Sequence, residues 1–554
     1  MSDENSRPEH NVRHFRQILL WPLQLMPIRK GAQIQRHWEL LERDAAGNPW
    51  RCVEDEFTGD PGQFQERHYS EFVAFLPYVQ RFLYGEGGIR GGAAGESPIR
   101  VFRRGDVTQV RLVYPGDRSE AIVFNVAHVD LYFFFDIDVA VLVVEISAPE
   151  INLDRAHETL YRFGRAYPTH WSADGQAGYC LQRVEWLSSN GEVLATSDYE
   201  RREKYLEYVD RYRAPCIASH WEYLLRPLVP HHSDEKGLIR YRQIEYHRMP
   251  MLAYLSFDDP RKLTRGDFVR LALVTMPTEP SEPDFSGRHS ENFESRYCYD
   301  RYWNDSNSGS PGTRYMCCGD SFTMVDSDAT PHSAERGSSR LEQFRHQFFL
   351  LFLIPHFHKA ALLMLSDRLG HTLNRLDIQD AESVRHFKRN IRQLKEIFLR
   401  FTHRYWFNEI SDQALVKQLY SMCNEFLGTE HLYMEVRQEI HDMSEYLDSD
   451  SLRRQANTVT RLTVVTIFGL IGTMAVGFLG MNLIAANDSP LLNKFGYFAM
   501  IFIPTAWLTL YTIVKSKRLS DFLEALADER LTSRAKFSTF LNIWRKTQRP
   551  GAGQ

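Results

Sequence analysis

Two long uncharged segments, Leu462–Ala486 and Phe495–Val514, are the clearest features of the hydropathy pattern. They contain 25 and 20 residues, and at ~1.5 Å per residue each helix would cross a hydrocarbon core of roughly 30 Å. Basic residues flank the outer ends of both segments: Arg453, Arg454, Arg461, Lys515, Lys517 and Arg518. The positive-inside rule therefore predicts two transmembrane helices, with both chain ends in the cytosol and the loop 487–494 outside.

Two other apolar stretches fit a folded domain better than a membrane. Ile122–Ile146 is rich in Val, Ile and Phe but contains four acidic residues. Because an ionised Asp at mid-bilayer costs about 2.5–3.5 kcal/mol, we expect two or three buried strands there. Phe348–Leu365 contains a proline, two histidines and a lysine, and this composition predicts a buried helix of a soluble domain.

The whole pattern predicts an α+β membrane protein with a large N-terminal cytosolic α/β domain, a helical stalk and two C-terminal spans. The expected parts are a domain over 1–340, a helical stalk region over 341–461, spans over 462–486 and 495–514, and a basic, amphipathic cytosolic tail over 515–554. Within the first domain we expect strands in Arg100–Ile146, helices at Asn152–Tyr167 and Tyr199–Tyr212, and a loop-rich insertion near 278–339. Ser411–Leu452 is predicted to be one stalk helix that runs into the first span.

Composition agrees with a membrane part that is only a small fraction of the chain. The mean hydropathy is −0.40, and the net charge of −5 argues against a nucleic-acid-binding protein, which would carry a basic stripe. Seven cysteines without a CxxC pair indicate reduced thiols in the cytosol, and the pair Cys317–Cys318 is expected in a plain polar loop. The N-terminal residues carry both charge signs and do not resemble a signal peptide. The expected location is the cell membrane, crossed more than once.

The first span ends in Gly480-Met481-Asn482. The runs LTVVTIF at Leu462–Phe468 and GFLGMN at Gly477–Asn482, a short loop and a final helix with a basic end resemble the CorA family of magnesium channels, the two-transmembrane GxN family. The resemblance covers roughly residues 440–518. It implies a homo-oligomer, a pentamer in that family, in which the first span lines the pore and the second faces lipid.

Magnesium chemistry suits an asparagine at the mouth of such a pore. Mg²⁺ gives up its water reluctantly, so neutral oxygen acceptors around a wide opening can recognise the hydrated ion. We therefore expect Gly480, Met481 and Asn482 to form the selectivity filter, with a ring of Asn482 carbonyls facing the ion's waters. Asp488 is the only acid of the outer loop and is expected to concentrate cations at the mouth.

Small, polar and apolar residues alternate on one stripe of the first span: Gly477, Thr473, Leu470, Thr466 and Leu462. The threonines are candidates to solvate a passing ion, and the leucines are candidates for an apolar constriction that gates by dewetting. The alternative is a helix-packing face whose threonines bond to their own backbone. The motif at the end of the span favours pore lining.

Four acids precede the first span: Asp442, Glu445, Asp448 and Asp450. Repeated around an oligomer, they are candidates for a regulatory Mg²⁺ site, and the alternative is a solvated acidic face.

Other functions remain open at this point. The same pore is also compatible with Zn²⁺, Co²⁺ or Ni²⁺, and a membrane-anchored sensor or scaffold would explain the large N-terminal part. We expect no enzyme and no bound cofactor, because the sequence has no GxxxxGK[ST], HExxH, nucleophile elbow or kinase signature.

Overall fold

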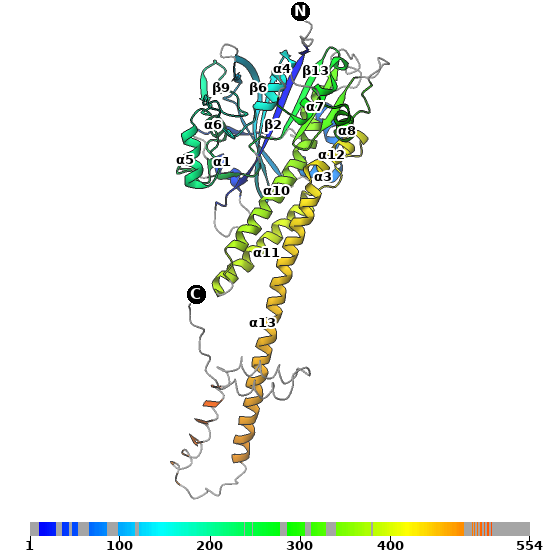
Figure 1. Ribbon diagram of the computed structural model, residues 1–554. Coiled ribbons are helices and arrows are strands. Elements are labelled where there is room, and N and C mark those ends of the chain that lie inside the picture. Colours follow the sequence, from blue (N-terminus) through cyan, green and yellow to red (C-terminus); the bar gives the residue numbers. More distant parts are fainter. Residues whose placement is uncertain are drawn as a thin grey trace, which may run out of the picture. The chain divides into compact units, whose positions relative to one another are not determined.

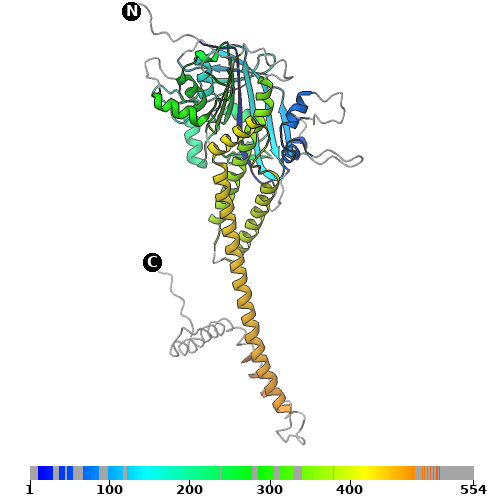
Figure 2. The same cartoon turned by 90° about the vertical axis from the view of Figure 1, so that its right-hand side faces the viewer.

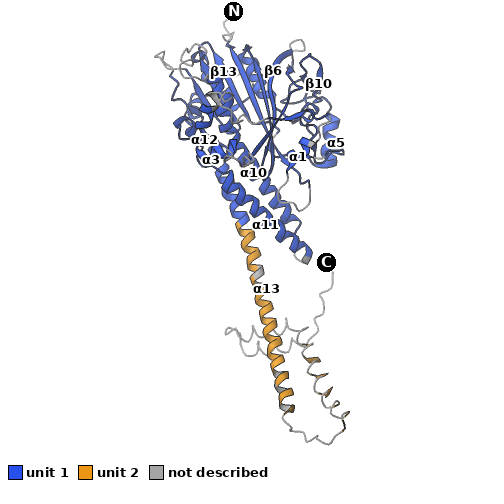
Figure 3. Ribbon diagram, turned by 180° about the vertical axis from the view of Figure 1, so that it is seen from behind, with its two compact units in different colours: residues 1–440 blue, residues 441–554 orange. Residues whose placement is uncertain are grey.

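The computed structural model divides the chain into two compact units, residues 1–440 and 441–554 (Figure 3). The residues that it describes are 10–28, 36–43, 47–53, 66–85, 98–116, 121–237, 239–245, 247–276, 285–304, 312–327, 340–377, 380–480 and single positions between 490 and 511. The first unit is a mixed α+β domain, as the pattern predicted, but it extends about a hundred residues beyond the predicted boundary at 340.

A large, mainly antiparallel sheet forms the centre of the first unit (Figure 1). Its main path runs β10-β9-β5-β6-β7-β2-β13-β16-β15-β14, and β13 and β16 are the one parallel pair along it. The strands are β2 (His14–Leu25), β5 (Gln109–Val113), β6 (Ala121–Phe134), β7 (Ile137–Ala148), β9 (Arg183–Leu187), β10 (Val193–Thr196), β13 (Met251–Phe257), β14 (Cys298–Tyr299), β15 (Arg314–Cys317) and β16 (Ser321–Ser327). Short strands β3 (Trp50–Cys52), β4 (Ile99–Arg104), β11 (Val229–Pro230) and β12 (Arg240–Gln243) extend it, and β1 (Asn11–Val12) pairs with β8 (Ile151–Asn152).

The centre of the sheet explains the apolar stretch that the acids interrupt. β7 lies between β6 and β2, and nearly all of its residues are buried. Both faces of a central strand must be apolar when helices cover both sides of the sheet. The acids of this stretch are also buried and pair with arginines, as Asp130 does with Arg103. The prediction of buried strands is therefore confirmed.

Helices cover both faces of the sheet (Figures 1 and 2). On one face, α4 (Leu153–Arg162), α6 (Ser219–Leu225) and α7 (Arg265–Leu273) enclose a core in which Trp21 of β2 packs edge-on against Trp221 at 6.2 Å. On the other face, α10 (Phe349–Asn374) lies against β2 and β7 and forms an antiparallel hairpin with α11 (Ala381–Arg404). Alternate residues of each strand thus face different layers.

The helix Arg340–Asn374, which includes α10, is the one described helix with the length and hydropathy to cross a membrane. Its apolar window is 89% buried inside the first unit. His356 and His358 within it are completely buried. The prediction of a buried domain helix is confirmed here.

Two expectations about secondary structure are wrong. The described residues of the region near 278–339, which we expected to be rich in loops, include α8 (Gly287–Tyr297) and strands β15 and β16. Cys317 consequently lies buried in β15 and not in a polar loop. The predicted helix over Ser411–Leu452 is interrupted: α12 (Ala414–Leu427) ends at Gly428, whose φ of 65° is left-handed. A glycine adopts that conformation at little cost and ends the helix.

After Gly428, α13 (Thr429–Gly480) continues as a single 52-residue helix. It contains no proline. The described residues of the second predicted span, such as Gly496, Met500, Trp507 and Tyr511, are helical. Trp507 and Tyr511, four residues apart, stack at 5.5 Å, which is the contact that helical spacing produces.

Candidate functional site

The predicted pore-lining residues all lie on α13 and share one side of it. With 3.6 residues per turn, the side chains of positions 462, 466, 470, 473, 477 and 480 fall within an arc of about 80°. Because α13 is unbroken from Thr429 to Gly480, this stripe is continuous along the helix. The described part of the chain therefore agrees with the predicted alignment.

The two threonines of the stripe donate hydrogen bonds to their own backbone. Thr466 Oγ1 donates to the carbonyl of Leu462 at 2.8 Å, and Thr473 Oγ1 donates to that of Gly469 at 2.9 Å. These bonds are the ones expected if the stripe is only a helix-packing face. They are also compatible with contact between the threonine oxygens and a hydrated ion. A hydroxyl whose proton is held by the backbone presents only lone pairs outward, and lone pairs accept hydrogen bonds from the waters of a hydrated cation.

Large apolar side chains on the same part of α13 are exposed in the single chain. Leu462 is 68% exposed and Leu470 is 63% exposed, and Ile467 and Val476 on other sides of the helix are also exposed. A helix that is apolar all round needs an apolar environment on every side. Among the described residues of the second unit, these exposed side chains thus lack the apolar cover that their composition requires, although Val464 of the same segment is buried.

The rest of the predicted filter lies outside the described residues. Gly480 is the last residue of α13, and Met481, Asn482 and Asp488 follow it in the part that the structure leaves undescribed.

The predicted regulatory acids are on α13, before the apolar segment. Asp442, Glu445 and Asp448 are exposed, and of Asp450 only the helical backbone is described. Helix geometry places Asp450 about 140° around the axis from Glu445, so the four acids do not form one stack. Among the described residues, no group of three or more His, Cys, Asp or Glu side chains has the geometry of a metal site.

Sequence reasoning missed a buried ionic network beneath the start of α10. Glu145 of β7 accepts hydrogen bonds from Arg16 of β2 and from Arg345, which donates at 2.7 Å. Burial alone would raise the pKa of Glu145, but the hydrogen bonds from Arg345 and Arg16 outweigh burial and lower it. Arg345 belongs to a π-helical turn, Phe344–Phe348, that precedes α10. The acidic residues within the apolar stretch Ile122–Ile146 were the sequence feature that could have indicated this network, because a buried acid needs a basic partner.

A second buried carboxylate joins α10 to the sheet. Glu245 is 3% exposed at its side chain and lies 3.7 Å from Lys359 Nζ, which is also 3.4 Å from Asp320. Burial raises the pKa of Glu245 to about 7, although Lys359 acts in the opposite direction. Folding therefore favours the protonated form of this carboxyl.

This pKa predicts a stability that depends on pH. A carboxyl whose folded pKa is raised contributes stability below its unfolded pKa and loses it as the pH rises through about 7. We expect Glu245→Gln to be more stable than wild type at pH 8, with a free energy of unfolding that is higher by about 2–3 kcal/mol. Near pH 4.5 the two proteins should have the same stability. Thermal unfolding of the full chain in detergent at several pH values measures this, with Glu192→Gln, at an exposed position, as the control. A difference between variant and wild type that does not change with pH would contradict the assignment.

Comparisons of the whole chain with protein-family models, with curated proteins and with solved structures found no match.

Proposed function

We propose that the protein is a channel for divalent cations, most of all Mg²⁺, in which α13 lines the pore of a homo-oligomer. The observation that carries this proposal is the stripe on α13, where exposed threonine oxygens alternate with exposed leucines and end at Gly480. Acceptor oxygens suit the waters of a hydrated cation, and the leucines suit a constriction that gates by dewetting. Asn482, directly after this helix in the sequence, supplies the amide carbonyl of the filter.

An oligomer follows from the geometry of the proposal. One or two helices cannot enclose a pore, so the stripe must face copies of itself around an axis. The exposed apolar residues elsewhere on the segment, such as Ile467, then face the second span or lipid. A pentamer in the cell membrane, with both ends of the chain in the cytosol, is the arrangement that the resemblance implies.

The membrane potential is a sufficient driving force. Moving one charge through 100 mV is worth about 2.3 kcal/mol, so a divalent ion gains about 4.6 kcal/mol on entry. No nucleotide hydrolysis is needed for uptake.

A sensor or scaffold anchored in the membrane is the second candidate. The size of the first unit, residues 1–440, favours it, because a pore alone does not need so large a domain. Transport of Zn²⁺, Co²⁺ or Ni²⁺ by the same pore is the alternative within the channel function.

Uptake into liposomes tests the proposal. The protein is reconstituted with an internal Mg²⁺ indicator, and an inside-negative potential is imposed by a K⁺ gradient. We expect potential-driven uptake, reduced about fivefold or more in Thr466→Val/Thr473→Val because two rings of acceptor oxygens are lost. Competition by Zn²⁺, Co²⁺ and Ni²⁺ in the same assay ranks the ions.

Thr460→Val is the matched control. Thr460 makes the same kind of bond, to the carbonyl of Ala456 at 2.9 Å, but helix geometry places it about 160° from Leu462. Uptake should be unchanged in this variant. Absence of uptake by intact wild-type oligomers would favour the sensor or scaffold.

A further inference from the structure

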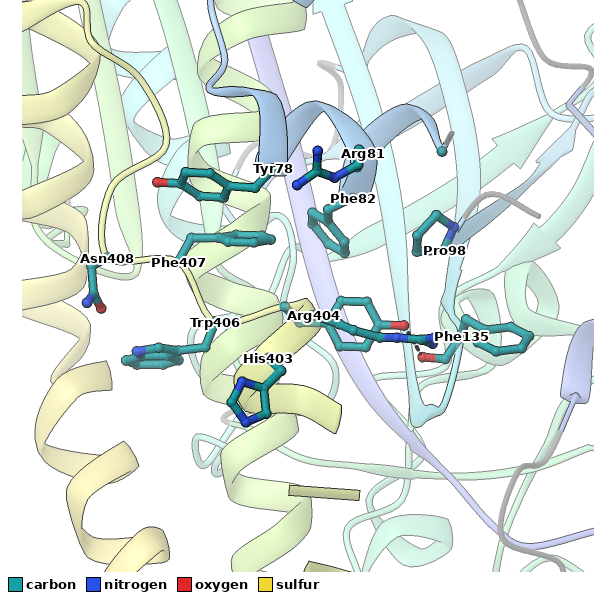
Figure 4. A pocket seen from close by; sticks show the side chains of 12 residues that line it. Tyr78, Arg81, Phe82, Pro98, Phe135, His403, Arg404, Trp406, Phe407 and Asn408 are labelled. Carbon is teal, nitrogen blue, oxygen red and sulfur yellow. Dashed lines mark hydrogen bonds between the residues drawn. The ribbon is translucent and has the colours of Figure 1, made fainter. Parts of the chain in front are cut away.

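A pocket of about 710 Å³ opens in the first unit between α3 (Pro77–Tyr84) and the end of α11 (Figure 4). α3 supplies Tyr78, Arg81 and Phe82 on one side, and residues 403–408 supply the other side. Phe135 and Pro98 close a third side. This volume lies within the range of about 300–1,000 Å³ that small-molecule sites occupy.

The walls of the pocket are held in place by contacts that a ligand would not need to disturb. Phe82 is buried and packs against Tyr405 and Phe407 at 5.4 and 5.3 Å. The hydroxyl of Tyr405 donates to the carbonyl of Phe135 at 2.6 Å. The described walls of the pocket are therefore built on a packed aromatic floor.

Two arginines and a histidine are the basic side chains among the described lining residues. Arg81, His403 and Arg404 line the pocket, all three exposed, and none of its described lining residues is acidic. Asp136, the acid bound to Arg404 at 2.8 Å, has a side chain only 2% exposed. The guanidinium groups of Arg81 and Arg404 are donors that suit an anionic ligand, which would share Arg404 with Asp136.

Aromatic faces lie beside these charges. Tyr78 is 40% exposed and its ring packs against Phe407 at 5.6 Å, while Trp406 is half-buried. A ring system stacks on such faces with little loss of side-chain entropy. The combination of guanidinium groups and aromatic faces selects a molecule with both a flat ring and a polyanionic group.

We propose that this pocket binds a nucleoside phosphate. Arg81 and Arg404 bind the phosphate oxygens, and the face of Tyr78 stacks on the base. The site also contacts the start of α13, because Trp406 stacks on Tyr433 at 4.4 Å. Binding does not depend on the channel function, so the two proposals stand or fall separately.

Binding of ATP to the full-length protein in detergent, followed by calorimetry in EDTA and again with Mg²⁺, tests the proposal. We expect saturable binding that is weakened about tenfold by Arg81→Gln and about tenfold by Tyr78→Leu, since each removes a contact of the kind proposed. Tyr78→Phe keeps the ring and should bind within about twofold of wild type. Arg202→Gln, at an exposed position of α5 (Arg202–Tyr212), should bind as wild type does.

Inorganic tripolyphosphate and adenosine separate the two halves of the ligand. Each should bind at least about tenfold more weakly than ATP. Equal binding of tripolyphosphate and ATP, with Tyr78→Leu unchanged, would overturn the nucleoside assignment. Equal binding of adenosine, or no binding of ATP by a wild-type protein that melts normally, would overturn the site.

Discussion

Asn482→Ala is expected to lower potential-driven Mg²⁺ uptake by about 100-fold or more while the oligomer stays intact. Each subunit would lose one carbonyl that accepts a hydrogen bond from the hydrated ion, worth about 0.5–1.5 kcal/mol. A ring of such losses adds up because the ion meets all subunits at one level of the pore. The measurement is the liposome assay with the internal indicator, and the size of the oligomer is checked by light scattering in detergent.

Two variants make this result specific. Asn482→Asp keeps an oxygen acceptor and adds negative charge, so it should still transport. Asn487→Ala makes the same substitution in the outer loop and should leave uptake unchanged. Wild-type uptake by Asn482→Ala would place the filter elsewhere, for example at the threonines of α13.

Short-range sequence patterns were sufficient to predict the strands within Ile122–Ile146 and the buried helix α10. The four acids inside Ile122–Ile146 distinguished strands from a membrane span, and Pro355 and the histidines did the same for α10. These predictions succeeded because burial in a protein tolerates a paired carboxylate or a buried histidine, while a hydrocarbon core does not.

The missed features depend on contacts between distant residues. β16 pairs in parallel with β13, more than sixty residues earlier, and no local pattern in a region rich in Pro and Ser shows that partner. Gly428 was visible in the sequence, but one glycine inside a helical pattern does not show whether it adopts a positive φ. The aromatic pocket likewise joins α3 to residues more than 300 positions later.

Within the candidate site, one part was predictable from helix periodicity and another part was not. The stripe from Leu462 to Gly480 follows from helix periodicity alone, and the described helix agrees with it. The acids at 442–450 were predicted as one stack from their spacing. Each residue turns about 100° around the helix axis, so Asp450, only two residues after Asp448, lies on another side of the helix. Three-residue spacing keeps a row together for one turn only.

Glu145→Ala is expected to destabilise the first unit by about 3–5 kcal/mol, because it breaks a buried ion pair and leaves its partners uncompensated. Glu145 is 5% exposed at its side chain, and its loss leaves the guanidinium groups of Arg16 and Arg345 without their shared partner. His128, with Nε2 at 3.8 Å from Glu145, cannot replace the lost partner, because burial lowers its pKa and favours the neutral imidazole. Urea unfolding followed by tryptophan fluorescence measures the change, since Trp21 and Trp221 are buried in the adjacent core.

Glu150→Ala is the matched control, because Glu150 also pairs with an arginine near the end of β7. That pair, with Arg13 at 3.0 Å, is about half exposed, so its loss should cost less than about 1 kcal/mol. Combining Glu145→Gln with Arg345→Gln should recover part of the stability, since it removes one of the uncompensated charges along with the carboxylate. If Glu145→Ala and Glu150→Ala unfold at the same urea concentration, the buried network does not fasten α10 to the sheet, and apolar contacts of α10 alone must do so.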